Sequence, residues 1–331
     1  MLYRRLNSLY QIRTSRRWSR IELNKIYNED CLEGMKRIPD GSVDMVLCDL
    51  PYGTVRGMKL DGWEEESVYW DEVIDNRELF KEYNRILKES GTAVLFSQEP
   101  FTSNLRTFKH NNVVFSYPLI WVKDHFANPF NSGRAPVSYF EDISVFRKKY
   151  DTQNLNPLRR YFEGVLDYAG LSSSKDVNKL LGHQRADHTF RITSTQFKLC
   201  TRETYKELEE VLKLGNMTGY KTFDELKEVN DKYGPTFNIQ GQAKYASNIL
   251  EFKKDYGKLH PTQKPVALFE YLIKTYTNKN ETVLDNCMGS GTTAIACMNT
   301  ERNFIGFELD ETYYNNSLER INNHEIGRAH V

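Results

Sequence analysis

The sequence has 331 residues, 45 Lys and Arg against 45 Asp and Glu, and 39% hydrophobic residues. This length allows one large domain or two small ones, and no apolar run approaches the roughly 18 residues of a membrane-spanning helix. Five widely spaced cysteines without a CxxC pair argue against a disulfide framework and a structural zinc site, so we expect a reducing cytoplasm. The balanced charge argues, at first sight, against nucleic acid as a partner.

The two ends of the chain differ from the rest. Residues 1–20 hold six arginines and no acidic residue, a composition shared by mitochondrial presequences and phosphate-binding arms. Core patterns begin only at Ile21, so we interpret this stretch as a basic N-terminal extension. Residues 326–331 read as a translated sequencing-adapter oligonucleotide, and residues 325–331 are therefore expected to be a non-native tail. The alternative is that they are native residues that end a helix.

Between residues 21 and 149, short apolar runs alternate with amphipathic stretches, as in a largely parallel sheet covered by helices on both faces. The helix is expected over Asn76–Lys88, with Gly91 ending it, and an acidic loop, Leu60–Asp71, precedes it. The expected strands are Asp44–Cys48, Thr92–Phe96, Val113–Val122 and Asp142–Arg147.

From residue 150 to 258 apolar strands become scarce, which favours a mostly helical insert within one α/β unit over two consecutive domains. The expected helices of the insert are Ser174–Leu181, Thr201–Lys213 and Thr222–Lys232. Residues 259–324 return to the sheet pattern. They predict a helix over Val266–Thr275, a strand at Thr282–Leu284, a helix from Thr292 and a strand at Phe304–Phe307.

The first motif is a glycine-rich turn between a strand and a helix, residues 286–294. Gly289 and Gly291 allow a tight turn and bring a ligand close to the main chain at the positive end of the next helix. Glu308, at the end of the following strand, offers a carboxylate for the two hydroxyls of a ribose. A purely structural turn and a dinucleotide fingerprint, G-x-G-x-x-A, are the alternatives.

The second motif, Asp49-Leu50-Pro51-Tyr52-Gly53, follows a buried strand at the sheet edge where open α/β folds hold ligands. Asp49 and the Leu50 carbonyl can accept hydrogen bonds from an exocyclic amine, while Tyr52 stacks on a flat ring. An ordinary turn containing a proline and a capping aspartate has the same spacing.

The third motif is the segment His260-Pro261-Thr262-Gln263-Lys264-Pro265, which precedes a helix. Its prolines favour an extended entry, and Lys264 supplies a cation for a carboxylate. A plain helix lead-in capped by Thr262 is the alternative.

Together and in this order, the three motifs resemble those of the β-group DNA amino-methyltransferases, which methylate adenine N6 or cytosine N4. The resemblance covers residues 21 to 321 and also includes Asn28–Leu32, Trp121–Lys123 and Glu141–Phe146. It implies a Rossmann-like α/β sheet, circularly permuted so that the catalytic motif precedes the cofactor loop, with a target-recognition insert at 150–258. S-adenosylmethionine is the implied cofactor.

Site roles follow from the same resemblance. The implied catalytic residues are Asp49, Leu50, Pro51 and Tyr52. The implied cofactor-binding residues are Asp30, Cys31, Thr262, Lys264, Asp285, Cys287, Gly289, Gly291, Thr292 and Glu308. Two positions depart from the family pattern. Leu50 replaces the usual first proline, and Cys287 replaces a phenylalanine that packs beside the cofactor, which puts cofactor affinity in doubt.

The implied reaction is direct methyl transfer to the amine of a base flipped out of double-stranded DNA. Asp at position 49 favours adenine N6, and cytosine N4 is the alternative. Residues 172–185 and 193–196 could form a helix pair that reads base edges. Its candidate DNA-binding residues are Gln184, Arg185, Arg191 and Gln196. A solvated polar surface is the alternative for each of them.

Several other functions are weighed against this one. His183, His188 and His260 lack ligand-like spacing, so no metal site is expected. An NAD-dependent oxidoreductase is disfavoured because too little chain follows the glycine loop, and a catalytically impaired DNA-binding protein is a further alternative. The family implies a companion restriction endonuclease and a homodimer as candidate partners, without a sequence signal for either.

The balanced total charge also conceals its distribution. The insert between residues 151 and 260 has 17 Lys and Arg against 15 Asp and Glu, so it is not a strongly basic clamp. We therefore expect binding to depend on base readout more than on phosphate attraction.

Overall fold

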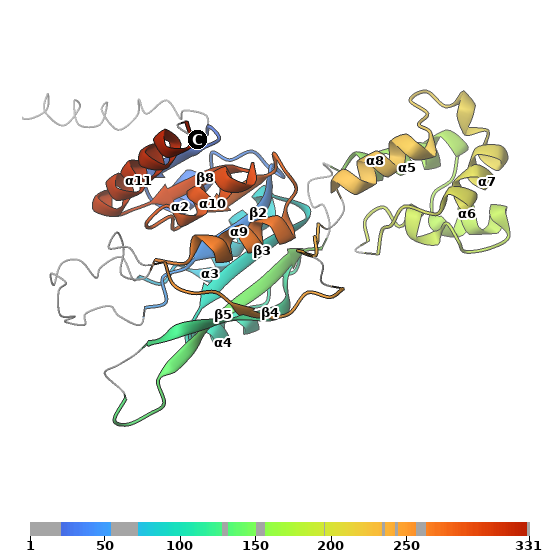
Figure 1. Cartoon of the computed structure of the whole chain (residues 1–331). Coiled ribbons are helices and arrows are strands. Elements are labelled where there is room, and N and C mark those ends of the chain that lie inside the picture. Colours follow the sequence, from blue (N-terminus) through green and yellow to red (C-terminus); the bar gives the residue numbers. More distant parts are fainter. Residues whose placement is uncertain are drawn as a thin grey trace, which may run out of the picture.

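The structure is a computed structural model that describes residues 21–53, 72–127, 132–149, 156–194, 196–233, 236–241, 244–255 and 263–329. In this part of the chain one sheet has the strand order β1-β8-β7-β2-β3-β5-β4-β6 (Figure 1). The strands are β1 Lys25–Asn28, β2 Val43–Asp49, β3 Leu87–Ser97, β4 Val113–Ala127, β5 Ser138–Lys148, β6 Ile249–Glu251, β7 Thr282–Asp285 and β8 Asn303–Glu308.

The sheet is mixed, with β5 running opposite to its neighbours. β1, β8, β7, β2 and β3 pair in parallel, β5 pairs antiparallel with β3 and β4, and β6 adds parallel to β4. β2 and β7 lie side by side through Met45 and Val283 although the whole insert separates them in sequence. The carboxyl end of the catalytic strand therefore meets that of the cofactor strand, and the expected permuted Rossmann-like fold is confirmed.

Helices cover both faces of the sheet because the central strands are apolar on both sides. On β2, Met45 and Leu47 pack toward one face, whereas Val46 and Cys48 pack toward the other. The first face is covered by α9 Val266–Tyr276, α10 Thr292–Thr300 and α11 Glu311–Ala329. The second is covered by α2 Cys31–Met35, α3 Asn76–Ile86 and α4 Phe101–Thr107.

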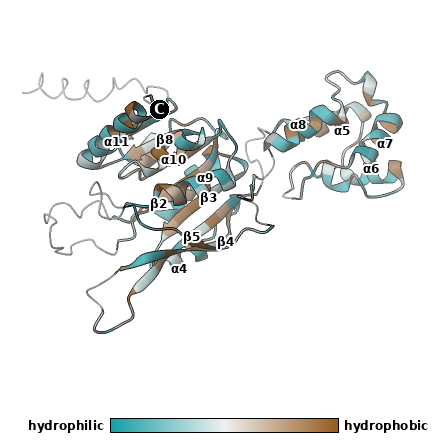
Figure 2. Ribbon diagram, viewed as in Figure 1, coloured by the Kyte–Doolittle hydropathy of each residue, from teal (hydrophilic) through white to brown (hydrophobic). Residues whose placement is uncertain are grey.

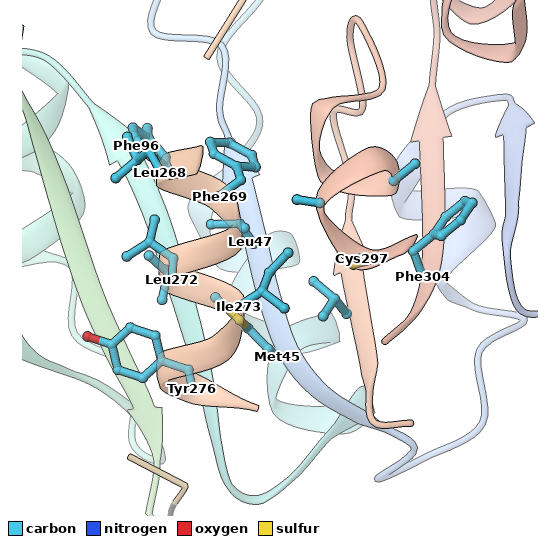
Figure 3. Close-up of a cluster of buried hydrophobic side chains, with 14 of the residues drawn as sticks. Met45, Leu47, Phe96, Leu268, Phe269, Leu272, Ile273, Tyr276, Cys297 and Phe304 are labelled. Atoms are coloured by element: carbon cyan, nitrogen blue, oxygen red, sulfur yellow. The ribbon is translucent and has the colours of Figure 1, made fainter. Parts of the chain in front are cut away.

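Figure 3 shows how α9 packs on the sheet. Leu268, Phe269, Leu272 and Ile273 point from one stripe of the helix onto β2 and β3, with Phe269 stacked on Phe96 at 5.3 Å between ring centroids. All of these side chains are almost wholly buried. This stripe fixes α9, and with it the motif segment that immediately precedes the helix.

A group of helices between β5 and β6 forms a second hydrophobic core, around Phe162, Tyr205 and Leu208. These helices stand beside the sheet unit and carry their apolar residues on the inner faces (Figures 1 and 2). Their bounds are α5 Pro157–Ala169, α6 Ser174–Leu181, α7 Arg202–Leu212 and α8 Phe223–Tyr233, with short 3₁₀ turns at Asp187–Phe190 and Leu214–Asn216.

A buried ion pair joins this helical unit to the sheet. Arg159 on α5 donates from Nε to Glu89 Oε1 on β3 at 3.1 Å and from Nη1 to the Ser194 carbonyl at 3.0 Å. The Arg159 side chain is only 3% exposed. Its guanidinium thus closes the junction between the two units.

Several local expectations were wrong. α3 ends at Ile86 instead of Lys88, because Leu87 already pairs with Val43 as part of β3. Residues 193–196 form a turn rather than the second helix of a recognition pair, as far as they are described. The elements not anticipated are β1, β6, α2, α4, α5 and α11.

Other expectations concern parts of the chain that the structure does not describe. The basic extension at residues 1–20, the acidic loop Leu60–Asp71 and the residues His260 to Thr262 all lie outside the described residues. Among those described, no helix is both long and apolar enough to cross a membrane.

Candidate active site

A cleft of about 840 Å³ opens at the carboxyl ends of β2, β7 and β8. Parallel strands that end at one edge bring together residues distant in sequence, so three motifs contribute to one site. Of the predicted site residues, the cleft is lined by Asp30, Cys31, Asp49, Leu50, Pro51, Tyr52, Lys264, Asp285, Cys287, Gly289, Thr292 and Glu308.

The catalytic motif is anchored by the buried strand β2. Asp49 is the last residue of β2, and the Leu50 side chain, 3% exposed, packs in the core beneath the turn. The Tyr52 hydroxyl donates a hydrogen bond to Asp49 Oδ1, and its half-buried ring lies 6.1 Å from that of Phe101. The motif thus presents a carboxylate and an aromatic ring together at the cleft.

The glycine loop and Glu308 form a second wall. Gly289 and Gly291 have φ of +52° and +78°, a region that favours glycine, and Gly291 is the N-cap of α10. The amide of Gly289 donates to Glu308 Oε2 at 2.7 Å, and that of Asp310 donates to Oε1 at 2.9 Å. Burial raises the pKa of Glu308, while these two amide bonds oppose the rise and hold the carboxylate in place.

Asp285 is a buried carboxyl at the end of β7. Its Oδ1 accepts a hydrogen bond from the Cys287 amide at 3.0 Å, and its Oδ2 accepts one from the Thr293 hydroxyl. Loss of solvent outweighs these bonds and raises the pKa of Asp285 to about 7. The group therefore changes charge near neutral pH.

The floor beside Asp285 contains polar groups that the sequence did not single out. The buried Tyr83 hydroxyl on α3 donates to Asn286 Oδ1 at 2.6 Å. Asn286 Nδ2 in turn lies 3.9 Å from Cys31 Sγ and 3.4 Å from Cys287 Sγ. Cys287, where the family has phenylalanine, thus belongs to a compact polar and thiol cluster. No metal-binding group of His, Cys, Asp or Glu is found in the described part of the chain.

Lys264 lies beside two carboxylates of the protein itself, in line with the expectation that it supplies a cation for a carboxylate. Its Nζ donates to Asp49 Oδ2 at 2.6 Å and lies 3.1 Å from Glu141 Oε2. Glu141 on β5 also accepts a hydrogen bond from Lys123 on β4. The two residues are close because Trp121 on β4 pairs with Glu141 in the antiparallel β4–β5 ladder. Lys264, Glu141 and Lys123 are each less than a tenth exposed.

The segment of Lys264 is held against the glycine loop. Thr292 Oγ1 donates to the Lys264 carbonyl at 3.4 Å and accepts from Arg320 Nη1 at 3.0 Å. Gln263 is 7% exposed and lines the cleft, and its Oε1 has no hydrogen-bond partner among the described residues. The position of Thr262, the remaining cofactor candidate of this motif, lies outside the described residues.

These groups fit a nucleoside that carries an amino-acid tail. Glu308 offers acceptors for ribose hydroxyls, and the unpartnered Gln263 oxygen offers one for an ammonium group. The positive φ values favour glycine at Gly289 and Gly291, and because glycine has no side chain a ligand can approach the loop backbone closely. Asp30 is less committed to a ligand, because its Oδ1 caps α2 through the Glu33 amide at 3.0 Å.

The candidate DNA-binding residues lie on the helical unit and not at the cleft. Gln184, Arg185, Arg191 and Gln196 are all exposed. Arg185 pairs with Glu207 at 3.2 Å, and Arg191 pairs with Asp187 at 2.6 Å. Gln196 Oε1 accepts a hydrogen bond from Arg191. Their role in DNA binding stays a prediction.

Glu141 and Lys123 are the main charged residues of the site to which the sequence patterns assigned no chemical role. Both stand in segments noted only as resembling sheet motifs of the family. A charged residue inside an otherwise apolar strand is a usable signal, because such groups are rarely buried without a partner. The partner itself could not be identified, since Lys264 lies far along the chain.

Comparison with known proteins agrees with this geometry. The DNA methylase family of N6 and N4 methyltransferases matches residues 43–319. The type II methyltransferase M.HindIII of Haemophilus influenzae is 24% identical over 89% of this chain and 94% of its own length. M.BglII of Bacillus subtilis is 26% identical over 88% of this chain and 67% of its own length.

Two solved structures share the fold. M1.HpyAVI in complex with SAM has a TM-score of 0.51 and 23% identity, covering 89% of this chain and 98% of that one. The cytosine-N4-specific PvuII DNA methyltransferase has a TM-score of 0.52 and 14% identity, covering 92% of each chain. Since the family match spans the catalytic motif, the glycine loop and everything between them, the protein belongs to the DNA methylases that act on adenine N6 or cytosine N4 with S-adenosylmethionine as methyl donor.

Proposed function

We propose that this DNA methyltransferase is site-specific and acts on the N6 amine of adenine, flipped out of double-stranded DNA into the cleft. The observation that carries the proposal is the Asp49 carboxylate, hydrogen-bonded by Tyr52 and Lys264 at the edge of the cleft. A carboxylate at this position of the motif goes mainly with adenine, whereas a serine goes mainly with cytosine N4. The helical unit with Arg185 and Arg191 would read the surrounding sequence.

The chemical task of these residues is to position a poor nucleophile. The lone pair of an exocyclic amine is delocalised into the ring, so the amine attacks weakly unless its hydrogens are held out of the conjugated arrangement. Asp49 and the Leu50 carbonyl would accept those two hydrogens and direct the nitrogen lone pair at the methyl group. Positioning of this kind can supply much of the rate enhancement.

Bound S-adenosylmethionine supplies a methyl group on a sulfonium, a good leaving group that becomes a neutral thioether. A nitrogen–carbon bond forms as the carbon–sulfur bond breaks, and the sulfur keeps the electron pair of the broken bond. The amine then loses one proton, for which Asp49 is the nearest acceptor, and Asp49 passes it to water when the product leaves. Tyr52 keeps the base in the cleft by stacking on its ring.

The decisive experiment measures tritiated-methyl transfer from S-adenosylmethionine to unmethylated DNA, followed by digestion to nucleosides. We expect the label in N6-methyladenine. Label in N4-methylcytosine would overturn the adenine assignment, and absence of label from every base would favour an impaired DNA-binding protein.

Asp49→Asn tests the division of labour within the cleft. The variant keeps the size of the side chain but loses the charge that accepts the amine hydrogens. We expect methyl transfer to fall by about a thousandfold, the loss of roughly 4 kcal/mol of transition-state stabilisation. The dissociation constant of S-adenosylmethionine, measured by calorimetry, should change less than about threefold. A collapse of cofactor binding would contradict the assignment of Asp49 to the base.

A further inference from the structure

Two buried lysines and a buried glutamate meet the partly exposed carboxylate of Asp49 at the base-binding side of the cleft. Asp49 ends β2, Glu141 lies on β5, Lys123 lies on β4, and Lys264 immediately precedes α9. The contacts between them run from Lys123 to Glu141, from Glu141 to Lys264 and from Lys264 to Asp49. Ionised, the four groups sum to zero charge.

Such a cluster is costly to bury and is not explained by stability alone. Each ion loses its water, and mutual attraction repays this loss only when the geometry is good. Apolar residues would fill the same space at lower cost, as they do on the neighbouring parts of β4 and β5, where Leu119, Ile143 and Val145 are buried. The cluster also lies at the one place where the proposed reaction needs a carboxylate.

We propose that Lys264 is a positioning residue that keeps the Asp49 carboxylate ionised and aimed at the substrate amine, and that Glu141 in turn holds the Lys264 ammonium in place. This inference rests on the proposed function, in which Asp49 accepts the hydrogen bonds of the amine. Lys264 acts through Asp49 and does not itself bind the base. The cofactor-binding role that the sequence suggests for Lys264 stays a prediction.

The direction of Asp49 is set by two donors. The Tyr52 hydroxyl bonds to Oδ1, and Lys264 Nζ bonds to Oδ2 at 2.6 Å. Each carboxylate oxygen has a second lone pair, so both oxygens can still accept a hydrogen of the amine. A carboxylate gripped at both oxygens cannot rotate away, which keeps one acceptor direction toward the cleft.

Lys264 is shared unequally between its two carboxylates. Its nitrogen is closer to Asp49, at 2.6 Å, than to Glu141, at 3.1 Å. Glu141 Oε2 has no well-aligned hydrogen-bond donor among the described residues, whereas Oε1 accepts from Lys123. Glu141 therefore holds the ammonium in position by charge, while the aligned hydrogen bond goes to Asp49.

The ionisation of Asp49 depends on opposing influences. Burial raises its pKa most strongly, the Lys264 ammonium lowers it, and the Glu141 charge raises it. The other groups that face Asp49 are Tyr52, Cys48, Lys123 and Asp285, from the turn after β2, β2 itself, β4 and β7. Among the described residues Lys264 is the cation in hydrogen-bond contact with Asp49, so its charge opposes the effect of burial and favours the ionised carboxylate.

The test follows the titration of Asp49 directly. Protein labelled with 13C at aspartate carboxyl carbons is titrated by NMR, with the Asp49 signal assigned by its absence in Asp49→Asn. Lys264→Met should move the Asp49 titration upward by about one to three pH units, the usual effect of one adjacent charge. Lys264→Gln, equally neutral but able to donate a hydrogen bond, should move it in the same direction and serves if Lys264→Met does not fold.

Two further variants fix the sign of the effect. Lys264→Arg keeps the positive charge and should leave the titration within about half a unit of wild type. Glu141→Gln removes a negative neighbour and should move the titration downward, by less than Lys264→Met moves it upward because the Lys264 charge acts on Asp49 more strongly than the Glu141 charge does. Equal titrations in wild type, Lys264→Met and Lys264→Gln would overturn the proposal.

Methyl transfer as a function of pH provides the second readout. The acid limb of the rate profile should follow the Asp49 titration, so Lys264→Met loses about tenfold in rate for each pH unit of displacement and recovers at higher pH. A merely structural role would lower the rate by one factor at every pH. If the titrations shift as expected but DNA receives no methyl group, the inference stands and the proposed function fails.

Discussion

Asp285 makes the stability of this protein depend on pH in the direction opposite to that of most carboxylates. Its side chain is 3% exposed, and burial raises its pKa from 3.8 to about 7. The folded protein thus retains a proton on Asp285 up to about pH 7, whereas the unfolded chain releases it near pH 3.8. In this window the folded state binds more protons, so the free energy of unfolding falls as pH rises.

The size of the effect follows from the displacement of the pKa. Roughly three pKa units at about 1.4 kcal/mol each give about 4 kcal/mol over the whole window. Roughly 2 kcal/mol of this is lost between pH 5 and pH 7, and less than about 1 kcal/mol more is lost above pH 7. Asp285→Asn removes the titration while keeping an acceptor for either the Cys287 amide or the Thr293 hydroxyl.

The assay is urea-induced unfolding of wild type and Asp285→Asn at several pH values from 5 to 8. The difference between the two unfolding free energies isolates residue 285, because the other titrating groups are common to both proteins. It should move in favour of the variant by about 2 to 3 kcal/mol over this range. A flat difference for Asp285→Asn would refute the reasoning.

Two further changes test the cofactor wall and the junction of the two units. Glu308→Ala removes the carboxylate that two backbone amides hold in the cleft. It should weaken S-adenosylmethionine binding, measured by calorimetry, by about ten- to a hundredfold. Glu311→Ala changes a nearby exposed residue and should leave this binding unchanged. Arg159→Ala leaves Glu89 without its charge partner at a buried site and should cost about 3–5 kcal/mol of unfolding free energy. Arg202→Ala breaks an exposed pair and should cost much less. Similar losses from the two arginine changes would contradict the importance of burial at the junction.

Some elements were predictable because their signals are local. The central strands β2, β3, β5 and β7 were found from continuous apolar runs, which only strands buried on both faces tolerate. α6 was found at its observed bounds, Ser174–Leu181, because an amphipathic pattern ends there at a glycine. The glycine loop was recognised from the spacing of Gly289 and Gly291, both of which have positive φ, a conformation that favours glycine.

The elements that were missed lack such signals or depend on neighbours. β1 and β6 are short edge strands with one buried residue each, Ile26 and Leu250, so no alternation can be read from them. The end expected for α3 is part of β3 instead, because Leu87 pairs with Val43 on β2. α5 does have sequence signals of a helix that were not recognised: Asn156 is its N-cap, Pro157 lies in its first turn and Gly170 ends it.

The sequence by itself determined the family, the order of the motifs and the identity of the chemical groups, because glycine spacing, Pro-Tyr turns and apolar periodicity are properties of short segments. Only the tertiary structure decided which groups meet. Lys264 is far from Asp49 in sequence, yet β2 and α9 pack on the same sheet and bring the two within 2.6 Å, with Glu141 behind them. The interaction between two charges is strong only where water is largely excluded, and packing of the whole fold excludes it.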